Sequence, residues 1–433
     1  MPKKRLTLAL GALATGSLLL SGCAASTTPV TDVAIADIAD IASCDPAESP
    51  ITVTFGTQAA EAMEIAVANL KAEYPGLEIA AEPQATSSYD DLTKTVVADI
   101  AVGKRPDLIM TGLGQLRFWT DTYEPAPIDT AALPATYKTQ FLDAGTVDGT
   151  VYLAPAQIST PVLLVNQDAL DAADAGEAAD ITTFDELVEA AEKVTAETGA
   201  PSVSIPAVGL ADWFSQAFVQ GSGETFVNED GSAGFGTDKA VEALSIWSTL
   251  ADKGLELGIA DQDAMAQFIG GNAAFLVYTT STIASLQKGI GDSFEWTPVD
   301  LPSVDADGGA LPAGGNGWIV LSDDECRAAF ANALIGELLS PEAVAGASGT
   351  SYSYIPVDTE AGEALLASDA ATPQLTYAWS YDKPLTPWGG FDGTNIVRVN
   401  DTIRTMAQKL QAGDDAEPTV ASAVSGIDAI VGE

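Results

Sequence analysis

The chain has 433 residues with 18 basic and 61 acidic side chains, no histidine, and a formal net charge of −43. Such an acidic surface repels nucleic acids and anionic lipids, and it disfavours a polyanionic ligand. Because 47% of the residues are hydrophobic, the chain can build a core and is not a disordered acidic tail. Its length predicts two domains.

The first 23 residues have the pattern of an export signal. Three basic residues, 3–5, precede an uncharged apolar run over residues 6–20, which is shorter than the ~20 residues needed to span a bilayer. The ending Leu20-Ser21-Gly22-Cys23 resembles the lipobox of bacterial lipoproteins, in which the cysteine is acylated and becomes the mature N-terminus. The alternative is an ordinary cysteine beside a soluble signal cleavage site. Removal of the signal leaves 15 basic and 61 acidic side chains, a net charge of −46.

Residues 24–48 are rich in Ala, Ser, Thr and Asp, and they are expected to form a flexible tether. After export two cysteines remain besides Cys23, namely Cys44 and Cys326. An even pair in an exported protein predicts one disulfide, which would join the start of the body to a helix beginning near residue 324.

The next segments alternate between strand and helix patterns. Residues 51–55, 77–81 and 107–110 read as strands, and apolar residues at helical spacing predict helices over 63–74 and 92–100. This alternation favours an α/β domain with a mostly parallel sheet. Ligands of such sheets bind beyond the carboxyl ends of the strands.

Residues 150–170 are expected to cross between two domains. Two short apolar runs, 151–154 and 162–165, flank a polar stretch that contains Pro155 and Pro161. Proline lacks the N–H that a central strand needs, so we expect the strand to break between these runs and then to resume.

The second half contains further alternating elements. Thr183 and Glu186 form a capping-box pattern that opens a helix closed by Gly199. Further helices are expected over residues 238–254, around 265–268, over 324–339, around 399–410 and over 420–431, and strands or extended segments over 273–278, 296–301, 314–321 and 353–357. The glycine-rich loop 303–309 is expected to be the second crossing.

Several stretches together resemble the family 1 extracellular solute-binding proteins, the maltose-binding-like receptors of ABC importers. They occur in the family's order and are residues 107–110, 151–170, 268–278, 314–321, 354–357 and 388–398. The crossing departs from the family pattern at residues 165–168, where the usual aromatic or lysine is missing, which puts the ligand in doubt more than the fold.

The resemblance implies a type II periplasmic-binding-protein-like fold with two α/β lobes, each a mostly parallel sheet flanked by helices, joined by hinge strands. The expected boundaries are 49–158 with 303–370 for one lobe and 159–302 with 371–433 for the other. Such a protein closes on a solute without making or breaking bonds, and the permease recognises the closed form.

Sugar sites need apolar ring faces together with amide, hydroxyl and carboxylate groups. The predicted rims supply candidates of both kinds: Gln58, Tyr89, Gln115, Gln157, Ser159, Asp212, Trp213, Tyr278, Gly315, Asn316, Trp388, Phe391, Asp392 and Arg398. Arg398 could pair with a phosphate, although a solvated or ion-paired arginine is the more common reading.

Other chemistries find little support. Without histidine, Ser-His-Asp catalysis and His-ligated metal sites are excluded. Residues 112–117 begin like a dinucleotide loop but have Arg117 where the third glycine belongs, and residues 305–308 lack the later carboxylates of a calcium loop. No metal, cofactor or nucleic-acid partner is expected.

The sequence therefore predicts a monomeric receptor of an ABC importer, lipid-anchored through Cys23 on the outer face of the membrane, that delivers a mono- or oligosaccharide to its permease. Two alternatives stay open. One is a polyol or glycerol-phosphate ligand. The other is a secreted glycosidase-like enzyme, because a chain with 61 acidic residues always offers some carboxylate pair.

Overall fold

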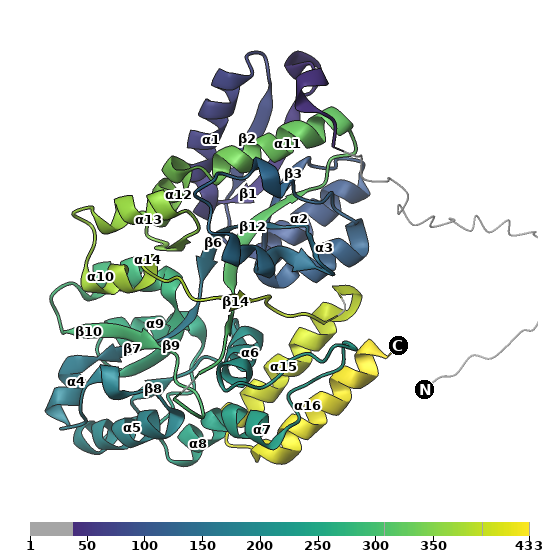
Figure 1. The fold of residues 1–433 in the computed structure, drawn as a ribbon. Helices are drawn as coiled ribbons and strands as arrows, with labels where there is room; N and C mark the ends of the chain where they lie inside the picture. Colours follow the sequence, from purple (N-terminus) through teal and green to yellow (C-terminus); the bar gives the residue numbers. More distant parts are fainter. Residues whose placement is uncertain (1–37, 307, 392, 433) are drawn as a thin grey trace, which may run out of the picture. The chain divides into compact units, whose positions relative to one another are not determined.

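The computed structural model describes residues 38–306, 308–391 and 393–432 (Figure 1). The expected signal peptide, the lipobox cysteine Cys23 and most of the expected tether lie outside these residues. The last part of that tether, residues 38–48, forms two short 3-10 turns, and Ile38, Ile41 and Cys44 in it pack against the core. This part of the segment therefore belongs to the body.

The first sheet has six strands, in the order β13 (Ile355–Pro356), β6 (Ala154–Ser159), β12 (Gly314–Val320), β3 (Leu108–Gly112), β1 (Ile51–Gly56), β2 (Ile79–Gln84). Its helices are α1 (Ala60–Glu73), α2 (Tyr89–Ala101), α3 (Leu116–Tyr123), α11 (Glu325–Leu338), α12 (Pro341–Ser348) and α13 (Thr359–Leu366). We call this sheet with its helices lobe 1. One hydrophobic core holds it together, with Ile109, Ile319 and Phe330 fully buried.

The second sheet has four strands, in the order β10 (Trp296–Asp300), β7 (Pro161–Asn166), β9 (Phe275–Thr279), β8 (Val203–Ser204). Its helices are α4 (Gln167–Ala172), α5 (Phe184–Thr198), α6 (Ala211–Gly221), α7 (Asp238–Leu244), α8 (Ile246–Asp252), α9 (Asp261–Ile269), α10 (Ile283–Ile290), α14 (Pro373–Trp379), α15 (Ile396–Gln411) and α16 (Ala416–Val431). We call this sheet with its helices lobe 2.

Strand β7 shows why lobe 2 needs helices on both faces of its sheet. Leu163 and Val165 belong to one hydrophobic core, and Val162 and Leu164 belong to another. Side chains alternate between the faces of a strand, so an unbroken apolar run is the pattern of a strand that is covered on both sides. All four side chains are fully buried.

Smaller elements complete the chain. Two two-stranded sheets pair β11 (Leu311–Pro312) with β14 (Leu385–Thr386) and β4 (Thr146–Val147) with β5 (Thr150–Val151). The 3-10 helices are η1 (Ile41–Ser43), η2 (Pro46–Glu48), η3 (Thr57–Ala59), η4 (Leu113–Gln115), η5 (Thr130–Ala132), η6 (Thr139–Gly145), η7 (Ala178–Asp180), η8 (Thr280–Thr282) and η9 (Gly393–Asn395).

The α/β class and the two lobes are as predicted, but the sheets are mixed rather than mostly parallel. In lobe 1 only the pairs β1–β2 and β1–β3 are parallel, while β12 is antiparallel to both β3 and β6. In lobe 2 only β8–β9 is parallel. The strands that enter after a crossing run against their neighbours, which periodicity within a single segment cannot reveal.

The crossing from lobe 1 to lobe 2 lies at Thr160, between β6 and β7. The expected break of the strand between the two apolar runs therefore occurs, at Thr160. Pro155, however, lies within β6 and does not interrupt the strand. It faces Gly317 of β12, where the register shifts between Asn316 and Gly317. A bulge at that place tolerates a residue without an N–H.

Two other elements differ from the sequence prediction. The single helix expected over residues 238–254 is two helices, α7 and α8, which meet at Ser245. The predicted strand at 77–81 forms two residues later, as β2. In contrast, the capping box of Thr183 and Glu186 is confirmed, and α5 ends at Gly199 with a left-handed φ of 73°.

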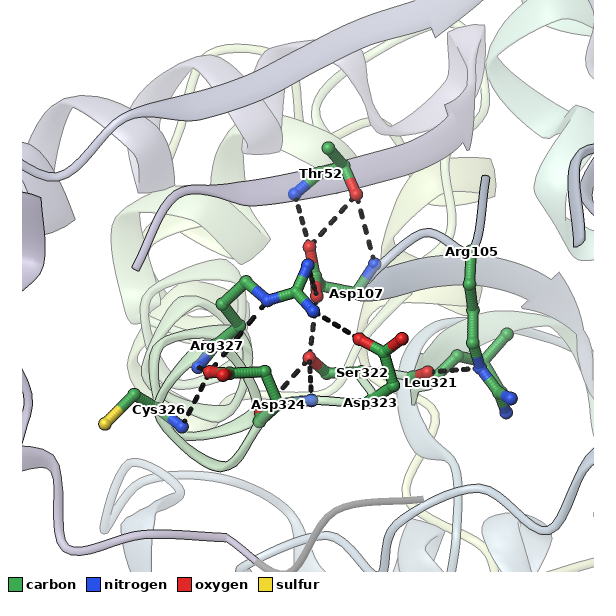
Figure 2. Close-up of polar contacts among 9 residues, drawn as sticks. All are labelled: Thr52, Arg105, Asp107, Leu321, Ser322, Asp323, Asp324, Cys326 and Arg327. Atoms are coloured by element: carbon green, nitrogen blue, oxygen red, sulfur yellow. Dashed lines mark hydrogen bonds and ion pairs between the residues drawn. The ribbon is translucent and has the colours of Figure 1, made fainter. Parts of the chain in front are cut away.

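A buried carboxylate ties lobe 1 together at the edge where β1 and β3 begin (Figure 2). Asp107, which is fully buried, accepts hydrogen bonds from the N (2.8 Å) and Oγ1 (3.0 Å) of Thr52 and from the Oγ of Ser322 (2.6 Å). Arg327 of α11 places Nη1 3.3 Å from the same carboxylate. This network joins β1, β3, the end of β12 and α11.

The two cysteines of the body form a disulfide beside this network. Cys44 and Cys326 are bonded with a Cα–Cα distance of 5.5 Å across 282 positions of sequence. Cys326 is the neighbour of Arg327 in α11 (Figure 2). The bond therefore fastens the beginning of the described chain to the helix that also holds the Asp107 network.

Candidate solute-binding site

Several polar side chains gather at one edge of the lobe 1 sheet. Strands β1, β3 and β6 run in the same direction and end at this edge, where the antiparallel β12 begins. Gln58 follows β1, Gln157 lies near the end of β6, and Gly315 and Asn316 lie at the start of β12. The fold thus brings together four predicted site residues that come from distant parts of the sequence.

A chain of hydrogen bonds connects these side chains. Nε2 of Gln157 donates to the main-chain oxygen of Gln58 at 2.9 Å, and since a carbonyl only accepts, this contact fixes the orientation of the Gln157 amide. Its Oε1 then accepts from Nδ2 of Asn316 at 2.7 Å. The same Nδ2 lies 3.1 Å from the hydroxyl of Tyr89, which lies 3.2 Å from the hydroxyl of Tyr354.

This cluster leaves two buried acceptors without a donor among the described residues, namely Oδ1 of Asn316 and Oε1 of Gln58. Burial raises the pKa of Tyr89 and of Tyr354, so both phenols stay protonated at neutral pH. The cluster is therefore uncharged, and its unpaired atoms are acceptors. Hydroxyl groups of a ligand are donors that would complement them.

Gly315 permits the close approach of strands within this cluster. Its φ is 103°, and a Cβ atom on it would lie 1.8 Å from the main-chain oxygen of Gln157. Only glycine fits this position. The close pairing of β12 with β6 therefore requires a glycine at position 315, whether or not this residue contacts a solute.

Gln115 lies at the next part of the same edge. Its Nε2 donates to Oδ1 of Asp90 at 2.9 Å, and its Oε1 accepts from the hydroxyls of Thr93 and Thr111, both at 2.8 Å. This amide is held in one orientation by three partners. Asp90 brings a carboxylate to the first turn of α2.

Lobe 2 contributes Asp212 from the first turn of α6. Its Oδ2 accepts from Nε1 of Trp388 at 3.1 Å. Burial raises the pKa of Asp212 to about 6, partly offset by the charge of Arg404 and by the hydrogen bond from Trp388. The negative charge of Asp90 raises the pKa of Asp212 a little further, because the two carboxylates repel each other electrostatically.

Tyr278 lies near the end of β9 and lines an open hollow of about 540 Å³. Leu210, Asp261 and Asp263 also line this hollow. Oδ2 of Asp261 accepts from the N–H of Gly209 at 2.8 Å. Burial raises the pKa of Tyr278 to about 12, and the charge of Asp261 adds to the shift. This hollow offers hydroxyl and carboxylate groups at the carboxyl end of a lobe 2 strand.

The structure places other predicted site residues differently. Trp213 is buried, with Nε1 donating to the oxygen of Pro312 at 3.0 Å, and Phe391 is fully buried in the lobe 2 core. Ser159 is buried at the end of β6. Arg398 is exposed in α15. The prediction for Asp392 lies outside the described residues.

Sequence reasoning missed Tyr354, Asp90 and Asp261. Tyr354 comes just before the short strand β13, whose pairing with β6 carries it to Tyr89. Asp90 and Asp261 lie in the first turns of α2 and α9, where acidic residues are common because they favour the positive end of the helix dipole. Because acidic residues are common at helix starts for this reason, the sequence gives no signal that Asp90 or Asp261 has an additional role in a site.

A larger hollow, of about 710 Å³, lies between the end of β10 and the segment after α14. Asp300, Tyr377, Tyr381 and Lys383 are among its lining residues. Lys383 pairs with Asp300 at 2.6 Å. None of the predicted site residues within the described part of the chain lines it.

The family described as bacterial extracellular solute-binding protein matches residues 66–375, which is well over half of the chain. The chain belongs to this family. This match confirms the predicted family. Its members are binding proteins rather than enzymes and act outside the cell. Among curated proteins, none matches this solute-binding protein.

Solved structures support the same fold. The cyclic α-maltosyl-1,6-maltose binding protein of Arthrobacter globiformis is 19% identical with a TM-score of 0.73, covering 88% of this chain and 98% of the other. The sugar-binding protein MalE of Xanthomonas citri is 16% identical with a TM-score of 0.73, covering 88% and 97%. UgpB of Mycobacterium tuberculosis, in complex with glycerophosphocholine, is 18% identical with a TM-score of 0.74, covering 88% and 98%. At such identities the likeness is one of fold.

No helix in the described part of this solute-binding protein is long and apolar enough to cross a membrane. The described residues also contain no cluster of three or more acidic or cysteine side chains that could hold a metal ion.

Proposed function

We propose that this protein is the receptor of an ABC importer that captures a carbohydrate between its two lobes and hands it intact to the permease. The observation that carries the proposal is the uncharged cluster of Gln58, Tyr89, Gln157 and Asn316 at the carboxyl edge of the lobe 1 sheet. Its two buried acceptors that have no donor among the described residues would suit the hydroxyl groups of a sugar, and its neutral amides and phenols would not compensate a bound anion.

Lobe 2 would complete the site with Asp212, Tyr278 and the indole of Trp388. A carboxylate accepts sugar hydroxyls, and an indole covers the C–H face of a sugar ring. Closure would follow from solute contacts with both lobes, because a ligand shifts a conformational equilibrium only by its differential affinity for the two states.

The anchor and the location are part of the proposal. Acylation of Cys23 after signal cleavage would hold the receptor, as a monomer, at the outer face of the membrane. A Cys23→Ala variant expressed in the native cell should then appear in the medium while the wild type stays with the membrane fraction. Equal distribution of both forms would contradict the anchor.

The function is tested by incubating purified protein with a panel of mono- and oligosaccharides, polyols and glycerol phosphates. A true solute stabilises the protein by RT ln(1 + [L]/Kd), about 2.7 kcal/mol at one hundred times Kd, and is recovered unchanged. Consumption of a sugar would indicate a glycosidase instead. Stabilisation by a glycerol phosphate alone, abolished by Arg398→Ala, would point to a phosphate ligand.

A further inference from the structure

Trp388 contacts both lobes of the protein. On the lobe 2 side its Nε1 donates to Oδ2 of Asp212 at 3.1 Å, and its ring centroid lies 5.7 Å from that of Trp213. The next residue, Gly389, donates its N–H to Oε1 of Gln216 at 2.8 Å. These contacts fix the indole against α6.

On the lobe 1 side the same indole lies over Gly114 of η4. A Cβ atom on Gly114 would stand 2.7 Å from Cδ2, 2.9 Å from Cε2 and 3.0 Å from Cε3 of Trp388. These three atoms belong to the rigid fused part of the ring, which cannot bend away as the end of a flexible side chain could. Even the methyl group of alanine would therefore displace the indole.

A second contact continues this junction along α3. The N–H of Gly393 donates to Oδ2 of Asp121 at 2.8 Å, and a Cβ atom on Gly393 would lie 2.1 Å from the main-chain oxygen of Arg117. Arg117 in turn holds the Asp121 carboxylate at 3.1 Å. The segment that follows Trp388 is thus also fitted closely to α3 of lobe 1.

We propose that Gly114 is a positioning residue for solute capture: because it lacks a side chain, Trp388 can reach lobe 1 and stand beside Asp212 at the edge of the site. A larger residue at position 114 would displace the indole of Trp388 and change the surface of the site that contacts a solute. The effect on capture rests on the proposed function, whereas the contact itself does not.

The contact can be tested without any solute, by acrylamide quenching of tryptophan fluorescence. Six of the seven tryptophans are buried, and Trp388 alone is partly exposed, so a change in quenching reports mainly on Trp388. The variants are Gly114→Ala, Trp388→Phe and the two combined. Gly236→Ala is the matched control, because an added methyl there makes ordinary contacts of 3.7 Å with Val424.

Gly114→Ala should raise the quenching constant above the wild-type value, and the rise should vanish in the Trp388→Phe background. Gly236→Ala should leave the constant unchanged. A Gly114→Ala protein that quenches like the wild type, or a rise that persists without Trp388, would overturn the proposal.

A second pair of variants covers the case in which Gly114→Ala does not fold. Trp388→Leu makes room for the added methyl, so Gly114→Ala with Trp388→Leu should be recovered folded, with the melting temperature of Trp388→Leu alone. A combined variant that also fails to fold would overturn the assignment. Because these measurements use no sugar, their outcome is separate from that of the solute panel.

Discussion

Nδ2 of Asn316 lies 2.7 Å from Oε1 of Gln157, and this contact joins β12 to β6 at the edge where the polar side chains gather. The two residues are 159 positions apart, and the first connection between the lobes starts just after Gln157. The amide pair therefore belongs to the candidate site and also lies directly before the segment that connects lobe 1 to lobe 2.

Replacing Asn316 with Asp should harm both stability and binding. The carboxylate has the shape of the amide but donates nothing to Gln157 or to Tyr89, and it would face the lone pairs of Gln157 Oε1 inside the protein. An unpaired buried acceptor costs about 1–3 kcal/mol and a buried charge costs more, so we expect a loss above about 2 kcal/mol in urea unfolding at pH 7.

The control for this variant is Asn272→Asp, which changes an exposed side chain and should cost less than about 0.5 kcal/mol. Equal losses in the two variants would mean that the hydrogen-bonded cluster contributes nothing specific.

The pattern of the sequence predicted those parts of the fold that depend on short segments. The helical spacing of α1 and α15, the capping box of α5 and the apolar run of β7 all report local geometry, and the structure contains each of them. The two-lobed architecture followed from resemblance over most of the chain rather than from any one motif.

Long-range pairing could not be predicted in this way. The hydroxyl of Tyr89 meets that of Tyr354, 265 positions away, only because β13 pairs with β6. The strand through Pro155 shifts its register against β12, with Ala156 of β6 as the extra residue, and this shift depends on the pairing of the two strands rather than on the sequence of β6 alone. The aromatic ring of Trp213 suits a sugar platform, but the indole is buried against Pro312 of β11 and Gly314 of β12, which are about a hundred positions away in the sequence.

The disulfide offers a second prediction. Cys44 and Cys326 close a loop of 282 positions, and long loops lose the most unfolded-state entropy when they are bonded. Cys44→Ser with Cys326→Ser should therefore lower the free energy of unfolding by about 2–5 kcal/mol, measured in urea under oxidising conditions. Adding a reductant should destabilise the wild type and leave the double variant unaffected. A reductant effect of equal size on both would exclude this bond as the cause.

The buried carboxylate of lobe 1 leads to a third prediction. Asp107→Asn keeps the shape of the side chain but removes the charge that faces Arg327 and one acceptor of the three hydrogen bonds (Figure 2). Breaking a buried ion pair costs about 3–5 kcal/mol. Asp323→Asn removes a more exposed partner of the same arginine and should cost less than about 1 kcal/mol. If the two variants unfold at the same urea concentration, the network does not hold lobe 1 together.

The last prediction concerns pH. The pKa of Asp212 is raised in the folded protein to about 6 from its ordinary value of 3.8, so the folded state binds the proton more tightly than the unfolded state does. The stability contributed by this group is therefore fully present below pH 3.8 and is lost as the pH rises through about 6. The amide of an Asp212→Asn variant cannot ionise, yet its oxygen can still accept from Trp388. This variant should consequently gain stability relative to the wild type between pH 4 and pH 7, by at most about 3 kcal/mol.

This gain is measured as the difference in free energy of unfolding between Asp212→Asn and the wild type at a series of pH values. Asp263→Asn, at an exposed position in the first turn of α9, serves as the control and should give a profile parallel to that of the wild type. A difference for Asp212→Asn that stays constant from pH 4 to pH 7 would show that Arg404 and Trp388 already compensate the buried charge. Asp212 would then face a solute as a carboxylate over the whole range, and sugar binding should show no loss as the pH falls towards 5.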